Sequence, residues 1–144
     1  MNIVWTDELV YLVRLIVAGI CGLAIGVERK NRAKEAGLPY LKAGVPMKEF
    51  VIAVKNVFRD AGLAEYDVYP PLHGIGCAEA ESPYPNEGTE AVFTAGMCVN
   101  TDISLFGLAG GSNRIEEGFI ITEEGADTIC PFMREYYENW LKGI

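Results

Sequence analysis

The sequence predicts an α+β domain in which helices flank a mixed or antiparallel sheet. Residues 46–61 place apolar side chains at helical spacing, and residues 128–141 have the pattern of a second helix. Between them, residues 98–105 and 114–122 alternate with the period of strands. The connection between these two strands is rich in glycine, so we expect them to form a hairpin.

The first element is an apolar run from Leu9 to Val27, interrupted only by Arg14. About 20 apolar residues cross a bilayer, so residues 8–28 are expected to form a hydrophobic transmembrane helix. The basic residues that follow are Arg29, Lys30, Arg32 and Lys34. By the positive-inside rule they place the rest of the chain in the cytoplasm, in a membrane-associated protein. The alternative is a buried helix of a soluble protein, which is then cytoplasmic throughout.

Small residues recur every four positions in this run, at Ala18, Gly22 and Gly26, which favours close packing of membrane helices. The run closes on a pattern made of Gly26, Glu28, Arg29, Arg32, Lys34, Ala36, Gly37 and Leu38. This segment resembles the first membrane helix and basic loop of the MgtC/SapB family. Glycine and proline then mark a change in composition, so we expect two regions, residues 1–40 and 41–144.

In the second region, Pro46 is expected to start the helix and Gly62 to end it. A proline-rich approach leads to His73, and residues 74–88 have the composition of a loop. A short strand is expected at residues 91–93, before the hairpin.

The predicted hairpin brings two carboxylates face to face. If it is symmetric about Ala109, Asp102 lies opposite Glu116 and Ser104 lies opposite Arg114, all on one face of the sheet. The other face is apolar apart from Glu117. Like charges that face each other on a sheet repel. The pair therefore requires solvation, protonation of one member, or a cation between them.

The composition excludes some functions. A formal net charge of −8 argues against nucleic acid as a partner, because phosphate binding requires a basic surface. The cysteines contain no C-x-x-C pair and there is one histidine, so a zinc-finger site is also excluded.

Three motifs follow one another at residues 73–117: H-G-I-G from His73, G-M-C-V-N-T-D ending at Asp102, and R-I-E-E from Arg114. Together they resemble the C-terminal half of the pita-bread metallopeptidases, which include methionine aminopeptidase, Xaa-Pro aminopeptidase, prolidase and creatinase. The resemblance implies half of a pita-bread fold over residues 43–133. It also implies a divalent metal (Mn, Co, Fe or Zn) held by His73, Asp102 and Glu116. Arg114 and Glu81 are then expected to bind a peptide substrate.

The sequence departs from the family pattern in three respects. Asp102 stands where the family usually has Glu, and Ala80 stands where proline-specific members have a second His. The family's paired Asp ligands have no counterpart before residue 43, where Asp7 is the single aspartate. We therefore expect one metal ion or none, and weak or absent peptidase activity unless another chain completes the site.

Two alternative functions stay open. One is a non-catalytic module that binds a peptide or a partner chain, and the other is a membrane-protein fragment of the MgtC/SapB type. Half of a pseudo-symmetric fold exposes apolar surface, so we also expect a homo-oligomer or a partner chain.

Overall fold

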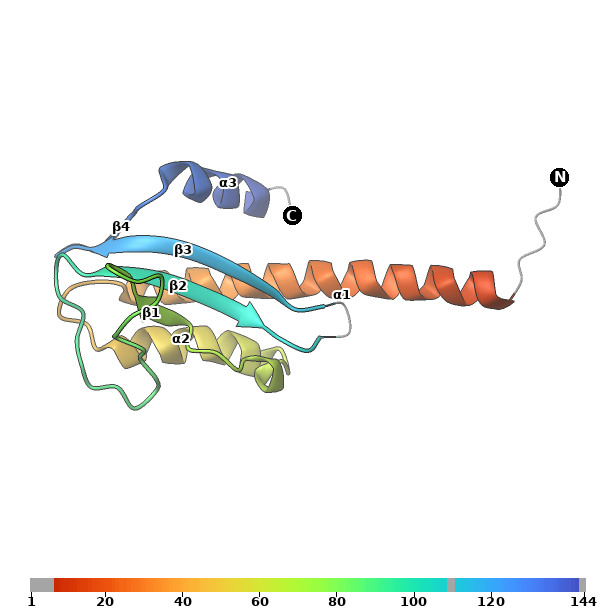
Figure 1. Cartoon of the computed structure of the whole chain (residues 1–144), viewed down its shortest axis with the longest axis horizontal. Coiled ribbons are helices and arrows are strands. Elements are labelled where there is room, and N and C mark those ends of the chain that lie inside the picture. The colour runs from red at the N-terminus through yellow and green to blue at the C-terminus, as the bar shows by residue number, and fades with distance from the viewer. Residues whose placement is uncertain (1–6, 109–110, 143–144) are drawn as a thin grey trace.

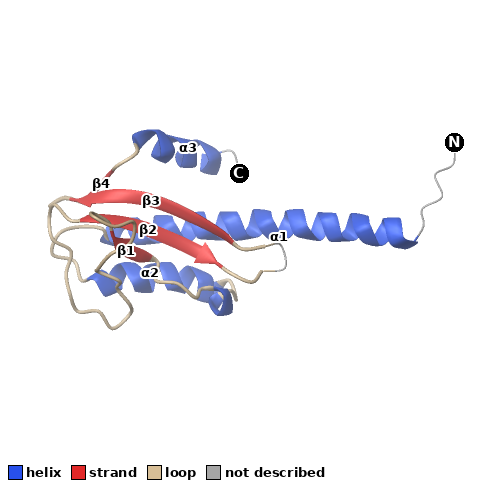
Figure 2. Cartoon of the chain, viewed as in Figure 1, coloured by secondary structure: helices blue, strands red, loops and turns tan. Residues whose placement is uncertain are grey.

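The computed structural model describes residues 7–108 and 111–142, and it confirms the α+β class (Figures 1 and 2). Its sheet is antiparallel, with the strands in the order β1-β2-β3-β4. The strands are β1 (Leu72–Gly74), β2 (Cys98–Leu105), β3 (Asn113–Ile121) and β4 (Ala126–Thr128). The helices are α1 (Asp7–Gly37), α2 (Met47–Asp60) and α3 (Pro131–Lys142), with 3₁₀ turns η1 (Leu38–Tyr40) and η2 (Ala64–Tyr66).

The core lies between the sheet and the two helices α1 and α2, which pack against each other (Figure 1). Helix α2 buries one stripe, as the periodicity predicts, and Gly62 follows its end with a φ of +70°. The buried apolar side chains at the centre include Phe50, Val54, Phe58, Leu72, Phe93, Val99, Ile103 and Phe119.

The short strands were the least predictable elements. The strand expected at residues 91–93 is wrong, because Val92 makes only an isolated bridge to Pro46. Strands β1 and β4 were not predicted. Each has three residues, too few for an alternation pattern to be visible, and each is defined by pairing with a neighbouring long strand.

The N-terminal helix differs from the expectation. Among the residues with described positions, no helix is long and apolar enough to cross a membrane, so the transmembrane prediction for residues 8–28 is not supported. The helix instead continues to Gly37, and its last turns pack on α2, β2 and β3. Lys30 and Lys34, expected on a cytoplasmic flank, are both fully buried in this contact. The side chains of Ala18, Gly22 and Gly26 lie outside the described part, and their packing role stays a prediction.

Charged groups in the core explain how α1 is held. The amine of Lys34 lies 2.8 Å from the carboxylate of Glu117, and the two side chains are 0% and 1% exposed. Thr128 donates to the same carboxylate, and Arg134 of α3 lies 3.7 Å from it. The single polar break in the apolar face of β3 is thus neutralised by a lysine from α1.

Candidate functional site

The polar face of the sheet has the register that the sequence predicted for the hairpin. Asp102 pairs in register with Glu116, and Ser104 with Arg114. On the next row, His73 of β1 pairs with Asn100 of β2. All these side chains share one face because residues paired directly across neighbouring strands point the same way, as do alternate residues along each strand. The sheet therefore brings His73, Asp102 and Glu116 to one surface.

Gly74 explains why the H-G-I-G motif has glycine after its histidine. A Cβ atom at Gly74 would lie 2.9 Å from the carbonyl carbon of Ser82 and 3.0 Å from Cδ of Pro83. The amide of Gly74 donates to the carbonyls of Glu81 and Pro83, at 2.9 and 3.0 Å. The loop that returns from residue 75 thus packs directly on the β1 backbone and fixes the position of His73.

Arg114 lies between the two opposed carboxylates. Its Nε is 3.2 Å from Oδ1 of Asp102, and its Nη1 is 3.0 Å from Oε1 of Glu116. The guanidinium also lies 5.7 Å from the centre of the Tyr69 ring, within range of a cation–π contact. The hydrogen bond to Glu116 and the two nearby carboxylates raise the pKa of Arg114 above its ordinary value. Arg114 thus contacts both members of the face-to-face pair.

Further hydrogen bonds reach the two carboxylates and the imidazole. Ser104 donates to Oδ1 of Asp102, and Asn100 donates to Oε2 of Glu116 at 2.9 Å. The Asn100 amide is also 3.4 Å from Nε2 of His73, whose Nδ1 lies 3.0 Å from the carbonyl of Gly74. In the neutral ring with its proton on Nδ1, Nδ1 donates to Gly74 and Nε2 accepts from Asn100. Asn100 was not predicted as a site residue, although its parity placed it on this face.

This arrangement does not fit a bound metal as it stands. A metal ion needs several free donor atoms directed at one point, commonly carboxylate oxygens and an imidazole nitrogen. Within the described residues, no group of three or more His, Cys, Asp or Glu side chains is placed to hold an ion. Asp102 and Glu116 face Arg114 instead, and Asn100 lies between Glu116 and His73.

A small cavity of about 150 Å³ opens beside this face. Its lining includes Tyr69, Pro70, His73, Glu79, Ala80, Tyr84, Asp102 and Arg114. Glu81, expected to bind substrate, does not line this cavity, and its carboxylate accepts a hydrogen bond from the amide of Ala78 at 3.3 Å. The two tyrosines were not predicted, because side chains in an irregular approach and loop have no periodic pattern.

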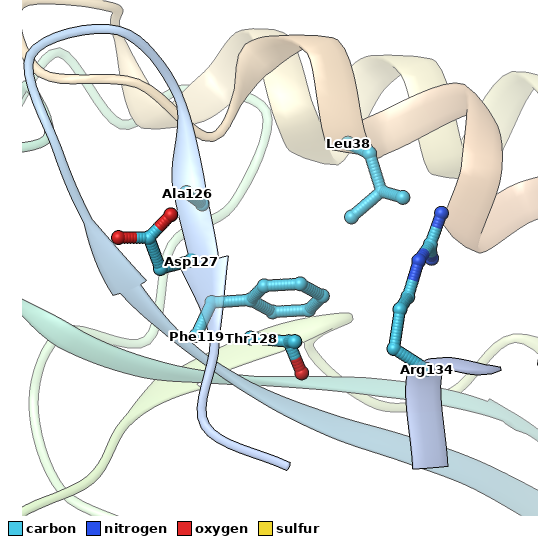
Figure 3. A pocket seen from close by; sticks show the side chains of 6 residues that line it. All are labelled: Leu38, Phe119, Ala126, Asp127, Thr128 and Arg134. Carbon is cyan, nitrogen blue, oxygen red and sulfur yellow. The ribbon is translucent and has the colours of Figure 1, made fainter. Parts of the chain in front are cut away.

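A larger cavity of about 320 Å³ lies elsewhere, between η1, strands β3 and β4, and α3 (Figure 3). Leu38, Phe119 and Arg134 are among its lining residues, and Arg134 is held by two contacts to Glu35, at 2.9 and 3.2 Å. None of the residues predicted for the site lines this cavity.

Comparisons with known proteins agree with the motifs. The model of metallopeptidase family M24 matches residues 27–123. The probable dipeptidase PepE of Mycobacterium tuberculosis is 34% identical over 103 residues, covering 70% of this chain and 28% of that protein. The Xaa-Pro dipeptidase of Pyrococcus furiosus is 29% identical over 111 residues, covering 77% of this chain and 31% of that protein.

A solved structure shows the same fold. The crystal structure of dipeptidase PepE from Mycobacterium ulcerans superposes with a TM-score of 0.68 and 33% identity, over 74% of this chain and 29% of that one. The chain thus spans less than a third of the length of each of these three relatives. The match starts at residue 27, so it includes Glu28 to Leu38, which had suggested MgtC/SapB. No finding supports that second resemblance.

Proposed function

Because the chain belongs to metallopeptidase family M24, we propose that its polar sheet face binds the end of a short proline-containing peptide, with weak or absent hydrolysis by this chain alone. The observation that carries the proposal is the cavity between Tyr69 and Tyr84, which opens onto His73 and Arg114. Relatives named Xaa-Pro dipeptidase and dipeptidase support the choice of a short peptide.

The cavity has the chemistry that such a ligand requires. Tyr69 and Tyr84 are 47% and 52% exposed, so both rings are accessible to a pyrrolidine ring, which packs well on aromatic surfaces. Arg114 is 38% exposed and supplies N–H donors to a peptide carboxylate. Glu79, also in the lining, is suited to a peptide amine. Hydrolysis is proposed to be weak because Oδ1 of Asp102 and both oxygens of Glu116 already face protein donors.

We expect the dipeptide Gly-Pro to bind with a Kd of about 1 mM, as a small ligand with few contacts does. Replacing Tyr84 by Ala should weaken binding about fivefold to tenfold, because one wall of the cavity is lost. An NMR titration measures the Kd of Gly-Pro for both proteins, in buffer with EDTA to remove metal ions. Tyr40→Ala is the matched control, since Tyr40 is an exposed tyrosine outside the cavity. If Gly-Pro does not bind at about 10 mM, ten times the expected Kd, the proposal is rejected.

Adding metal distinguishes the non-catalytic binding module from a metal-dependent peptidase. If this chain is a binding module, Gly-Pro binding and thermal stability are unchanged by Mn²⁺ or by EDTA, and no proline is released. Proline release that requires Mn²⁺ and disappears in Glu116→Gln instead establishes a peptidase. A peptide that binds but is not cleaved, in either buffer, supports the module.

We also propose that the chain self-associates through the first part of α1. This part extends beyond the sheet and the other helices (Figure 1). Its exposed apolar side chains include Leu9, Tyr11, Leu12, Val13, Leu15, Ile16 and Val17. Apolar surface of this extent usually marks an interaction site. The double variant Leu12→Glu/Ile16→Glu, one turn apart on one helix face, is expected to convert an oligomer to a monomer in light scattering. A wild-type chain that is monomeric would contradict this.

A further inference from the structure

The electrostatics of the polar face depend on one arginine. Asp102 is 6% exposed and Glu116 is 39% exposed, so the pair is only partly solvated. Two carboxylates directly across a sheet destabilise it unless a positive group lies near both. Arg114 reaches both from within the same hairpin, through different nitrogens and at 3.2 and 3.0 Å.

The groups around Asp102 and Glu116 favour a guanidinium, rather than a metal ion, between the two carboxylates. Ser104 and Asn100 donate to the carboxylates, so Oδ1 of Asp102 and both oxygens of Glu116 already have partners within the protein. Asn100 also faces Nε2 of His73, the nitrogen that would have to be free for coordination. Tyr69 lies next to the guanidinium and helps to hold it in place.

We infer that Arg114 is the resident cation of this site: its guanidinium neutralises Asp102 and Glu116, and a divalent ion binds there only when Arg114 is displaced. A metal and the guanidinium then compete for the same oxygens. The inference uses family membership only to say which ion to test, and it does not depend on peptide binding.

The competition predicts a gain of function on removing the arginine. Arg114→Met retains most of the aliphatic stem and leaves the two carboxylates without their cation. We expect this variant to bind Mn²⁺, which accepts carboxylate and imidazole ligands, at least about tenfold more tightly than the wild type. Isothermal titration calorimetry and the loss of the free-Mn²⁺ EPR signal measure this with no peptide present. We also expect Mn²⁺ to raise the melting temperature of the variant more than that of the wild type.

Three further variants make the test specific. Arg114→Met/Glu116→Gln removes one ligand and should lose the gained affinity. Arg114→Lys keeps a charge but cannot bridge both carboxylates with separate nitrogens, so its affinity should be intermediate. Arg59→Met removes an arginine that pairs with Glu87 at 2.7 Å outside the site, and should leave Mn²⁺ binding unchanged.

Two results would overturn the inference. One is a wild type that binds one Mn²⁺ per chain as tightly as Arg114→Met, with loss of binding in Glu116→Gln. The other is a folded Arg114→Met or Arg114→Lys, verified by circular dichroism, with no gain in affinity over the wild type. Failure of Gly-Pro binding in EDTA bears on the proposed function alone, because the Mn²⁺ titration contains no peptide.

Discussion

Replacing Lys34 by Met is expected to lower the free energy of unfolding by about 3 kcal/mol, because it leaves the buried carboxylate of Glu117 without its closest cation. Thr128 and Arg134 still contact that carboxylate, which is why complete unfolding is not expected. Urea denaturation followed by circular dichroism measures the change. This is one of the two largest effects that the structure predicts. Lys34 belongs to α1, the helix that the sequence analysis expected to cross a membrane.

Two variants test the explanation. Lys42→Met removes a lysine that is 42% exposed and lies 3.9 Å from Glu124, so it should change stability by less than about 0.5 kcal/mol. The double variant Lys34→Met/Glu117→Met removes both buried charges and should recover most of the loss. If Lys34→Met is no more destabilising than Lys42→Met, the buried ion pair does not hold α1 on the sheet.

Replacing Lys30 by Met is expected to have the opposite effect and to stabilise the protein. Lys30 is fully buried, and within the described part of the chain its Nζ has no hydrogen-bond partner. Burial lowers the pKa of Lys30 from its ordinary 10.5 to about 8. This lowering by about 2.5 pH units corresponds to about 3.5 kcal/mol, at about 1.4 kcal/mol for each pH unit. We expect Lys30→Met to gain about 2 to 3 kcal/mol at pH 7, since Met fills similar space without a charge.

The gain should depend on pH in a defined direction. Below pH 8 the amine is protonated in both states, so the wild type bears the full cost of burying the charge. Between pH 8 and 10.5 the folded state has lost this proton and the unfolded state has not, so wild-type stability rises with pH. The difference between wild type and Lys30→Met should therefore shrink as pH rises from 7 to 10. A difference that is constant over this range, or a variant less stable at pH 7, would contradict the assignment.

These two lysines connect the fold to the site. Consecutive residues of β3 point to opposite faces, so Glu116 joins the polar face while Glu117 points toward α1. The two glutamates of R-I-E-E therefore have different roles. Glu116 belongs to the proposed ligand site, and Glu117 anchors helix α1. Destabilising the Lys34 contact is expected to loosen β3, and with it the positions of Glu116 and Arg114.

Much of the site was predictable because strand geometry is regular. The period of two, together with glycines in the connection, was enough to place Asp102 opposite Glu116 and Ser104 opposite Arg114. The motifs at His73, Asp102 and Arg114 also identified the family that the comparisons show. The cavity walls at Tyr69 and Tyr84 were not predictable, because irregular segments have no period from which to infer direction.

The sequence by itself determined the α+β class, the hairpin register, the helix of residues 46–61 and the family, since each depends on local spacing or on contiguous motifs. Tertiary structure alone decided three things: that Arg114 lies between the opposed carboxylates, that Lys34 is the partner of Glu117, and that the end of α1 belongs to the core. The Lys34–Glu117 contact joins residues 83 positions apart. A basic residue after an apolar run has the same local pattern beside a membrane as beside a buried carboxylate, and only packing distinguishes the two.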